Sequence, residues 1–485
     1  MEIPKEIKTI INKLQKAGFE AYIVGGCVRD ILRGREPEDW DITTDAQPEQ
    51  IQKIFPKNFY ENNFLTVTVK TQNKDPKLKE IEITTFRLEA KYSDKRHPDE
   101  IRFAKTLQED LARRDFTVNA IALDLRKSDF KIYDPYDGQK DLDAKIIRAV
   151  GNPADRFSED ALRMTRAIRL AAVLDFKIEP ETREAIKKNA SFLQVISKER
   201  VRDEFVKIIM SGRAAQGIED LRELGLLKQI VPELEEGYKV GQNKHHIYDC
   251  WEHCLLSLKY AVSQKFAKEV RIASLFHDIG KPRVKQGEGQ DSTFYNHEIV
   301  GASMTAKILE RLRFPRKEAE KIFKLVRYHL FYYNPGEVGE SSARRLLMKV
   351  GQENVEKLLQ VRMADRIGSG VPKAEPYKLR HLKYLFEKVS QDPISAKMIK
   401  VNGNDVMKIL KISAGPKVGQ ILDVLLGYVL EEPKKNNKKF LTEEAKRLGG
   451  LSDKELNSLA QKAEKEKEDI EMKKDKMTKE KYWVT

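Results

Sequence analysis

Residues 21–44 read Ala-Tyr-Ile-Val-Gly-Gly-Cys-Val-Arg-Asp-Ile-Leu-Arg-Gly-Arg-Glu-Pro-Glu-Asp-Trp-Asp-Ile-Thr-Thr, and they decide the fold of the first part of the chain. A strand-like apolar run from Ala21 to Val24 ends at Gly25-Gly26, where a helical pattern begins. Glycines at such a turn let backbone N–H groups approach a phosphate, and the helix N-terminus adds a partial positive charge. The stretch therefore predicts a phosphate-binding turn, although Gly-Gly is also ordinary turn sequence.

Two carboxylates follow the helix, at the start of a second strand-like run. Asp39 and Asp41 flank Trp40 ahead of residues 42–44, and side chains alternate along a strand, so the two acids should point the same way. Same-facing carboxylates suit Mg²⁺, a hard cation that takes oxygen ligands and holds substrate phosphates. Alone, such a pair is more often a solvated strand edge or a helix cap. Together with the glycine turn and Arg29, it predicts phosphoryl or nucleotidyl transfer.

The composition is that of a large basic protein with few cysteines. The chain has 485 residues, a net charge of +14 and 40% hydrophobic residues, which suits about three or four domains. The positive charge favours an anionic partner, with nucleic acid favoured over a membrane surface. Cys27, Cys250 and Cys254 cannot make a disulfide framework, which indicates a reducing compartment. Without a signal segment or a long apolar run, we expect a soluble cytoplasmic protein with no membrane partner.

The remainder of residues 1–150 reads as mixed helix and strand. Strand patterns cover residues 65–70 and 81–87. Glu82 in the second of these is either a third carboxylate facing the aspartate pair or a surface charge. Residues 89–104 are charged and broken by a proline, which is typical of a mobile loop.

Polar residues after this loop are candidates for nucleotide contacts. Arg113 and Arg114 have the fork geometry that holds a triphosphate. Asn119 carries both a donor and an acceptor, so it is a candidate for reading a ribose or a base edge. Beyond Gly151 the pattern becomes helical for most of the remaining chain.

The first helix of that part carries a row of charged side chains. Asp160 and Arg163 are three residues apart and therefore neighbours on one helix face, with Arg166 close by and Arg169 about half a turn round. Asp160 offers acceptors and Arg163 a rigid donor fork, which is the complement that base edges need. By spacing alone, an intrahelical ion pair is the simpler interpretation, and Glu159 could also pair with Arg163.

Residues 245–370 contain a separate set of histidines and aspartates. His277 and Asp278 are adjacent, and His253 and Asp365 complete an N/O ligand set for a transition metal or Mg²⁺. A single histidine here would be an ordinary helix residue, whereas the complete set predicts metal binding.

Further histidines lie in the same part of the chain. His297 and His329 could hold a second metal, as in two-metal hydrolysis. His245 and His246 lie just ahead of the set and have no clear role. Residues 431–485 are dense in Lys and Glu, and the last thirty residues predict a charged solvated helix or a frayed tail.

These motifs, in this order, resemble those of the class II tRNA nucleotidyltransferase and poly(A) polymerase family. The matching stretches are Val-Gly-Gly-Cys-Val-Arg-Asp (24–30), Asp-Trp-Asp (39–41), Glu-Asp-Leu-Ala-Arg-Arg-Asp-Phe-Thr-Val-Asn-Ala (109–120) and Glu-Asp-Ala-Leu-Arg-Met-Thr-Arg-Ala-Ile-Arg (159–169). Residues 245–370 resemble the HD metal-dependent phosphohydrolase domain. The resemblance implies an α+β fold, with a polymerase-β-like nucleotidyltransferase head built on a mixed sheet, an all-α neck, an HD helical domain and a helical tail. The expected domains are residues 1–150, 151–240, 241–370 and 371–485, the last binding tRNA.

The resemblance also assigns roles to single residues. Asp39 and Asp41 would be catalytic and would bind two Mg²⁺ ions. The residues expected to bind the nucleotide are Gly25, Gly26, Arg29, Arg114, Asn119, Asp160, Arg163, Arg166 and Arg169. Among these, Asp160 and Arg163 would pair with the base of CTP or ATP as a protein template, which replaces the ion-pair interpretation. Residues 89–104 look like the family's flexible loop, which helps the switch from C to A addition.

The implied function is addition of CCA to the 3′ end of tRNA from CTP and ATP, without a nucleic-acid template. Mg²⁺ would act in the head, and a divalent metal of unknown identity would occupy the HD site. A poly(A) polymerase, an enzyme that adds only CC or only A, and an HD phosphohydrolase as the main activity remain alternatives.

Overall fold

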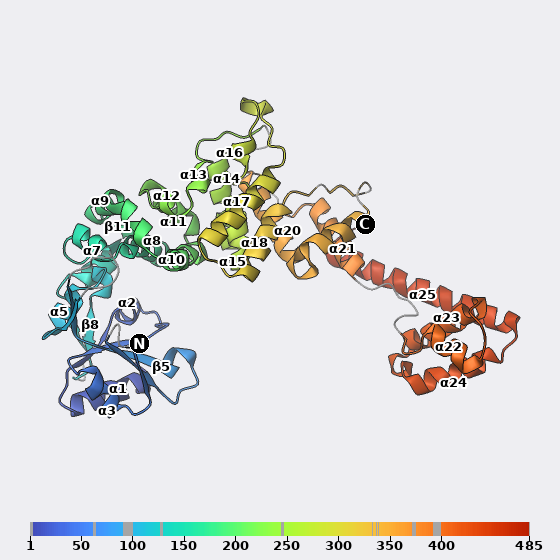
Figure 1. Ribbon diagram of the computed structural model, residues 1–485, viewed down its shortest axis with the longest axis horizontal. Coiled ribbons are helices and arrows are strands. Elements are labelled where there is room, and N and C mark those ends of the chain that lie inside the picture. Colours follow the sequence, from blue (N-terminus) through green and yellow to red (C-terminus); the bar gives the residue numbers. More distant parts are fainter. Residues whose placement is uncertain are drawn as a thin grey trace. The chain divides into compact units, whose positions relative to one another are not determined.

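The computed structural model describes residues 3–61, 65–90, 100–126, 130–243, 247–331, 333–335, 337, 339–370, 375–390 and 399–484. The chain divides into two compact units. Unit 1 comprises residues 1–330 and 356–374, and unit 2 comprises residues 331–355 and 375–485. Strands gather in the N-terminal part of unit 1, and helices make up most of the rest (Figure 1). The predicted α+β class is confirmed.

A seven-stranded mixed sheet forms the head. Its strand order is β3-β4-β5-β2-β1-β8-β9, in which β2 and β5 are parallel and the other neighbours antiparallel. The bounds are β1 Ala21–Val24, β2 Asp41–Thr44, β3 Asn58–Glu61, β4 Thr66–Lys70, β5 Glu80–Thr85, β8 Ala122–Asp124 and β9 Lys131–Tyr133. All four residues of β1 are buried, so this central strand fixes the glycine turn that follows it.

Short helices surround this sheet. They are α1 Lys5–Lys16, α2 Gly26–Leu32, α3 Pro48–Ile54, α4 Pro76–Lys79, α5 Leu107–Ala112, α6 Gly138–Ala144 and the 3₁₀ helix η2 Thr117–Asn119. The loop predicted over residues 89–104 is wrong at both ends, because β6 Arg87–Ala90 and β7 Glu100–Phe103 pair as an antiparallel ribbon. Residues 91–99 of the predicted loop lie outside the described part of the chain.

The neck that follows the head is helical apart from one short strand pair. Its helices are α7 Pro153–Glu159, α8 Leu162–Leu174, α9 Pro180–Asn189, α10 Lys198–Met210, α11 Ala214–Glu223, α12 Leu227–Ile230 and α13 Pro232–Glu235. β10 Ile146–Ile147 pairs in parallel with β11 Lys177–Ile178. Helix α8 packs against both α10 and α11. A Cβ at Gly217 of α11 would lie 2.6 Å from Ile208 Cγ2, so the missing side chain allows α10 and α11 to approach closely.

The rest of unit 1 is a helical domain around buried histidines. Its helices are α14 Cys250–Ser263, α15 Lys268–Phe276, α16 Lys281–Val284, α17 His297–Arg311, α18 Arg316–Arg327 and α20 Val355–Gly368. A Cβ at Gly368 of α20 would lie 2.8 Å from the carbonyl oxygen of His253 in α14. This close helix contact brings Asp365, one turn before Gly368, to the His253 side chain.

Unit 2 consists of helices, the last of which is long. They are α19 Glu340–Val350, α21 Tyr377–Ser390, α22 Gly403–Leu410, α23 Pro416–Glu431, α24 Lys438–Gly449 and α25 Asp453–Tyr482. Leu456 near the start of α25 is fully buried in a core shared with α22, α23 and α24. At its other end, Lys481 and Tyr482 each bond Glu387 of α21 at 2.6 Å.

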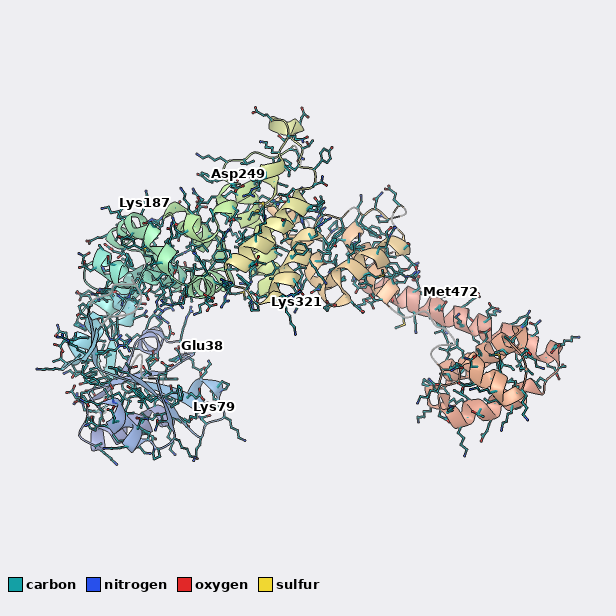
Figure 2. All side chains as sticks on the ribbon, in the orientation of Figure 1. Glu38, Lys79, Lys187, Asp249, Lys321 and Met472 are labelled. Carbon is teal, nitrogen blue, oxygen red and sulfur yellow. The ribbon has the colours of Figure 1, made fainter. Side chains whose placement is uncertain are left out.

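Helix α25 therefore corrects the expectation of a solvated or frayed tail, because both of its ends pack within unit 2. Between them the helix is exposed, as at Met472, which is 62% accessible (Figure 2). The Lys- and Glu-rich composition of α25 reflects only that exposed face.

Candidate functional site

The glycine turn of the head places bare backbone beside a cation and an acid. Gly25 follows β1 with φ +85° and ψ −142°, a conformation nearly restricted to glycine. A Cβ there would lie 3.0 Å from Arg114 Nη1 and 3.4 Å from Asp41 Oδ2. A Cβ at Gly26 would lie 3.5 Å from Arg29 Nη2. Five predicted site residues therefore meet around this turn: Gly25, Gly26, Arg29, Asp41 and Arg114.

Three carboxylates gather beside the turn. The parallel register sets Asp41 of β2 opposite Glu82 of β5, and both line a cavity of about 270 Å³. This geometry favours the interpretation of Glu82 as an acid facing the aspartate pair. Asp39 precedes β2 and is exposed, whereas Trp40 beside it is buried.

The local environment makes it costly to keep Asp41 ionised without a cation. Burial raises the pKa of Asp41 to about 6; Arg114 lowers it, and the charges of Asp39 and Glu82 raise it. A bound divalent cation would oppose that repulsion, and oxygen ligands of this kind are what Mg²⁺ takes. The donor set therefore fits a hard divalent metal.

Arginines form another wall of the same cavity. Arg87, Arg113 and Arg114 line it together with the acids. Asp110 is fully buried and accepts a hydrogen bond from Arg113 Nε at 3.0 Å, while Arg114 Nη2 lies 3.6 Å from its other oxygen. Although burial raises the pKa of Asp110, the guanidinium groups of Arg113 and Arg114 bring it below its usual value. The cavity thus pairs acids for a metal with cations for a polyphosphate.

The sequence reasoning missed Asp110 as the anchor of these arginines. The sequence spacing of Asp110 could have revealed this contact, because residues three and four apart on a helix face one another. Asp110 on α5 is three residues before Arg113 and four before Arg114.

A chain of hydrogen bonds links the glycine turn to the neck. Arg29 Nη1 donates to Asn119 Oδ1 at 2.8 Å, and Asn119 Nδ2 donates to Asp115 Oδ1 at 3.2 Å. Arg166 of α8 donates to Asp115 Oδ2 from Nε at 2.9 Å and from Nη2 at 2.6 Å. Burial raises the pKa of Asp115, but Arg166, Arg163 and the hydrogen bond from Asn119 together outweigh burial and hold the pKa well below its usual range. Asn119 is buried here, and its side chain orients Arg29.

The prediction that one helix carries both Asp160 and Arg163 is wrong, because the helix is broken before Arg163. Helix α7 ends at Glu159 and α8 begins at Leu162, while Asp160 is extended with φ −134° and ψ 105°. Asp160 Oδ1 accepts from the Leu162 N–H at 2.9 Å. The carboxylate thereby satisfies a free N–H at the start of α8, as capping residues do. Asp160 therefore belongs to the turn and Arg163 to the first turn of α8.

Each of the four predicted base-reading side chains is held by a partner. The pairs are Asp160 Oδ2 with Arg200 Nη2 at 2.9 Å, Arg163 Nη1 with Glu159 Oε2 at 2.6 Å, Arg166 Nη2 with Asp115 Oδ2 at 2.6 Å, and Arg169 Nε with Glu204 Oε2 at 2.7 Å. The Glu159–Arg163 ion pair anticipated from spacing is present. Arg200 and Glu204 both belong to α10, so this helix holds both ends of the row.

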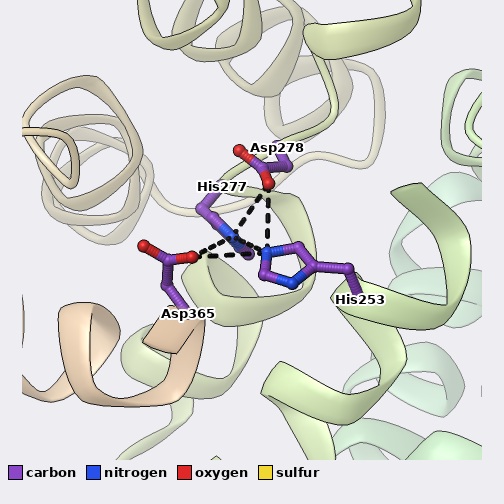
Figure 3. Close-up of side chains that lie close together, drawn as sticks. All are labelled: His253, His277, Asp278 and Asp365. Atoms are coloured by element: carbon purple, nitrogen blue, oxygen red, sulfur yellow. Dashed lines mark hydrogen bonds and ion pairs between the residues drawn. The ribbon is translucent and has the colours of Figure 1, made fainter. Parts of the chain in front are cut away.

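Four buried side chains meet in the second half of unit 1 (Figure 3). His253 comes from α14, His277 and Asp278 follow α15, and Asp365 comes from α20. One ligand atom of each lies within 4.8 Å of all the others. His253 Nε2 and His277 Nε2 are 2.8 Å apart and lie 3.1 and 3.3 Å from Asp278 Oδ2.

This donor set fits a divalent metal. Two imidazole nitrogens at 2.8 Å require a proton or a cation between them, and two carboxylates supply the balancing charge. Burial lowers the pKa of His277, but Asp278 and Asp365 outweigh burial and raise it to about 10, so these carboxylates favour positive charge beside the ring. The sequence therefore identified four residues that the fold brings together as a candidate metal site.

A second group shares Asp278. His297 Nε2 and His329 Nε2 lie 3.3 and 3.7 Å from Asp278 Oδ1. The Nδ1 atoms face backbone carbonyls: His277 to Ser274 at 2.9 Å, His297 to Phe294 at 2.8 Å and His329 to Val326 at 2.7 Å. Such bonds fix the ring and leave Nε2 to bind a metal. His245 and His246 lie outside the described residues.

A cavity of about 520 Å³ opens beside these ligands. Lys281, Arg362 and Arg366 line it. Lys281 Nζ lies 2.7 Å from Asp278 Oδ2, and Arg362 Nη1 lies 2.6 Å from Asp365 Oδ2. Sequence reasoning did not single out these cations, although Lys281 and Arg362 each stand three residues from a ligand. Their charge suits an anionic substrate next to the metal position.

The head, with its cavity of acids and arginines, is followed by a helical domain that carries the buried histidine and aspartate set. Family models match the poly A polymerase head domain at residues 21–148, the probable RNA and SrmB-binding site of polymerase A at residues 175–237, and the HD domain at residues 246–368. Over these three ranges the chain is similar to poly(A) polymerases and to HD domains. Within the described residues, no helix is long and apolar enough to cross a membrane.

Curated relatives resemble about half of the chain. A CCA-adding enzyme of Ligilactobacillus salivarius is 46% identical over 230 residues, which is 47% of this chain and 55% of that protein. A CCA-adding enzyme of Staphylococcus epidermidis is 42% identical over 224 residues, or 46% and 54% of the two chains. The chain thus spans about half the length of the curated relatives it matches.

Solved structures resemble nearly the whole chain. The Bacillus stearothermophilus CCA-adding enzyme in complex with CTP is 28% identical, with a TM-score of 0.59 over 92% of this chain and 98% of that one. The Thermotoga maritima CCA-adding enzyme complexed with tRNA is 20% identical, with a TM-score of 0.51 over 90% and 93%. At this lower identity the likeness concerns the fold alone.

Proposed function

We propose that the protein adds CCA to the 3′ end of tRNA from CTP and ATP, without a nucleic-acid template. The observation that carries the proposal is Asp41 beside Glu82, in a cavity that Arg113 and Arg114 also line. This is the charge pattern that a metal–nucleotide complex needs. The names of the relatives support CCA addition as the particular reaction.

In this proposal the head supplies the chemistry. Asp39 and Asp41 would hold Mg²⁺, which when bound activates the tRNA 3′-hydroxyl and neutralises the triphosphate. Arg114, resting against Gly25, would bind the triphosphate across the cavity. Arg29, fixed by Asn119, would bind the same nucleotide from α2.

The neck would choose the base. Asp160 would accept from the amino group that cytosine and adenine share, and Arg163 would donate to the ring nitrogen beside it. Arg166 and Arg169 would assist from the same helix. Since each of these side chains already has a partner, a bound base would exchange with it or share it.

The tRNA would bind through the neck and the C-terminal helices. The net charge of +14 suits a polyanion, so affinity should fall with salt. The domain boundaries proposed are 1–150, 151–240, 241–370 and 371–485. A tRNA substrate would place the protein in the cytoplasm.

A nucleotide-addition assay tests the proposal. We would incubate the protein with tRNA that ends before CCA, supplying each nucleoside triphosphate singly and in pairs. Three added residues from CTP plus ATP would support CCA addition. A long A tail from ATP alone would indicate a poly(A) polymerase, and addition of only CC or only A would indicate a partial enzyme.

A second proposed activity is metal-dependent phosphohydrolysis in the HD domain. Asp278 lies between two histidine groups and beside a cavity lined by cations, which favours this activity. We would measure bound metal and hydrolysis of 2′,3′-cyclic nucleotides for the wild type and Asp278→Ala. Without metal and hydrolysis in the wild type, the domain would be a tRNA-binding scaffold, and hydrolysis without nucleotide addition would make it the main activity.

A further inference from the structure

Arg200 of α10 binds the carboxylate of Asp160. Within the described part of the chain its side chain makes one hydrogen bond, from Nη2 to Asp160 Oδ2 at 2.9 Å. Its Nη1 is buried and has no hydrogen-bond partner among the same residues. Arg163 differs, because it also donates to the Arg113 carbonyl at 3.0 Å and so holds the head against the neck. Removing the Arg200 side chain therefore changes the surroundings of Asp160 and breaks no other ion pair among the residues that the structure describes.

The Asp160 carboxylate is held at both oxygens. Oδ1 accepts from the Leu162 N–H at 2.9 Å, and Oδ2 accepts from Arg200. A carboxylate held only at Oδ1 can turn about its side-chain bonds, whereas one held at both oxygens directs its remaining lone pairs one way. Arg200 therefore sets the direction from which Asp160 can accept a hydrogen bond from a ligand.

Contacts with neighbouring helices hold α10 in place, and they thereby fix the position of Arg200. Glu204, one turn further along, pairs with Arg169 of α8. At the end of α10, Arg271 of α15 donates to the carbonyls of Ile209 at 3.4 Å and Met210 at 3.0 Å. A helix C-terminus collects partial negative charge, so a buried arginine there stabilises it.

A fixed carboxylate distinguishes two classes of base. Cytosine and adenine present an amino group where uracil and guanine present a carbonyl. A carboxylate only accepts hydrogen bonds, so it attracts the amino group and repels the carbonyl. We propose that Arg200 is a positioning residue for base selection, which holds Asp160 so that CTP and ATP are accepted and UTP and GTP are rejected. The inference rests on the proposed function, in which Asp160 reads the base.

The variant Arg200→Ala tests the inference. We would measure kcat/KM for CTP and for UTP on tRNA that ends before CCA, with the wild type and the variant. The preference for CTP over UTP should fall at least about tenfold, because the carboxylate loses its direction. Arg200→Lys should restore part of the preference, since an ammonium can still donate to Oδ2. If Arg200 only stabilised the fold, all nucleotides would lose kcat/KM equally and the preference would stay.

Arg202→Ala is the matched control on the same helix. Arg202 donates to the Arg313 carbonyl and lies over the Phe314 ring, away from Asp160. Its removal should leave the preference for CTP unchanged. An unchanged preference in Arg200→Ala, with near-wild-type melting, would overturn the inference alone. A wild type that adds neither C nor A would instead overturn the proposed function.

Discussion

Asp41 and Glu82 lie opposite each other in the parallel pairing of β2 and β5, although the sequence separates them by two helices, two strands and their connections. Burial raises the pKa of Asp41 to about 6. The sheet therefore assembles an acidic site that is unfavourable by itself and becomes favourable when a cation enters.

Loss of either metal-binding acid should stop nucleotide addition. Asp39→Ala and Asp41→Ala should each lower the rate about a thousandfold or more, because charge stabilisation at the reacting phosphate is lost. Binding of tRNA, measured by gel shift, should stay close to wild type. Asp75→Ala, at the exposed cap of α4, is the control and should keep its activity. Near-normal turnover in either site variant would contradict the assignment.

Gly25→Ala should cost both stability and activity. The φ of +85° strains any side chain there by about 1–2 kcal/mol, and the new Cβ would lie 3.0 Å from Arg114 Nη1. Gly18→Ala has a similar φ of +92°, but its Cβ would meet nothing within 4 Å. Melting temperatures should fall in both variants, whereas the KM for CTP should rise only in Gly25→Ala. An equal KM in the two variants would mean that the Arg114 contact is unimportant.

The raised pKa of Asp41 predicts a stability change with pH. Between about pH 4 and 6 the folded protein binds more protons than the unfolded chain, so stability falls as the pH rises through this window. Without metal, Asp41→Asn should be more stable than wild type by about 3 kcal/mol at pH 8, and the difference should vanish near pH 4. Urea unfolding in EDTA at both pH values measures it. A difference that does not vary with pH would disprove the linkage.

The sequence predicted features that are local and missed those that join distant segments. Val24 and Gly25 are contiguous, so their strand and turn could be predicted. Asp160 and Arg200 are 40 residues apart, and only the packing of α8 on α10 brings them together. The break at Asp160 was missed because capping of α8 by its carboxylate outweighed the helical spacing.

The packed ends of α25 show a different limit of prediction from sequence. Leu456, Ala460 and Ala463 recur at helical spacing and are buried, a pattern that periodicity could have revealed. The surrounding Lys and Glu residues dominate the composition and led to the expectation of a solvated tail. The contact of Tyr482 with Glu387 has no such local signal.

Metal content should depend on Asp278 more than on any single histidine of the second group. Asp278 contributes an oxygen to both ligand groups, whereas His297 belongs to one. Asp278→Asn should therefore lose most bound metal and His297→Ala only part of it, as measured by mass spectrometry of the purified proteins. His381→Ala, in unit 2, is the control and should keep wild-type metal. Equal metal in all three variants would exclude this cluster as the site.

The choice of nucleotide should be separable from the chemistry. Asp160 lies in the neck and Asp41 in the head, so Asp160→Ala should change which nucleotide is added, while Asp41→Ala should stop all addition. Arg163→Ala should combine altered choice with lower stability, because Arg163 also holds Glu159 and the Arg113 carbonyl. Single-nucleotide incorporation with each of the four triphosphates measures the choice, and thermal melting measures the fold. If Asp160→Ala slowed all four nucleotides by one factor, Asp160 would only be the cap of α8, and base choice would have to lie elsewhere in the neck.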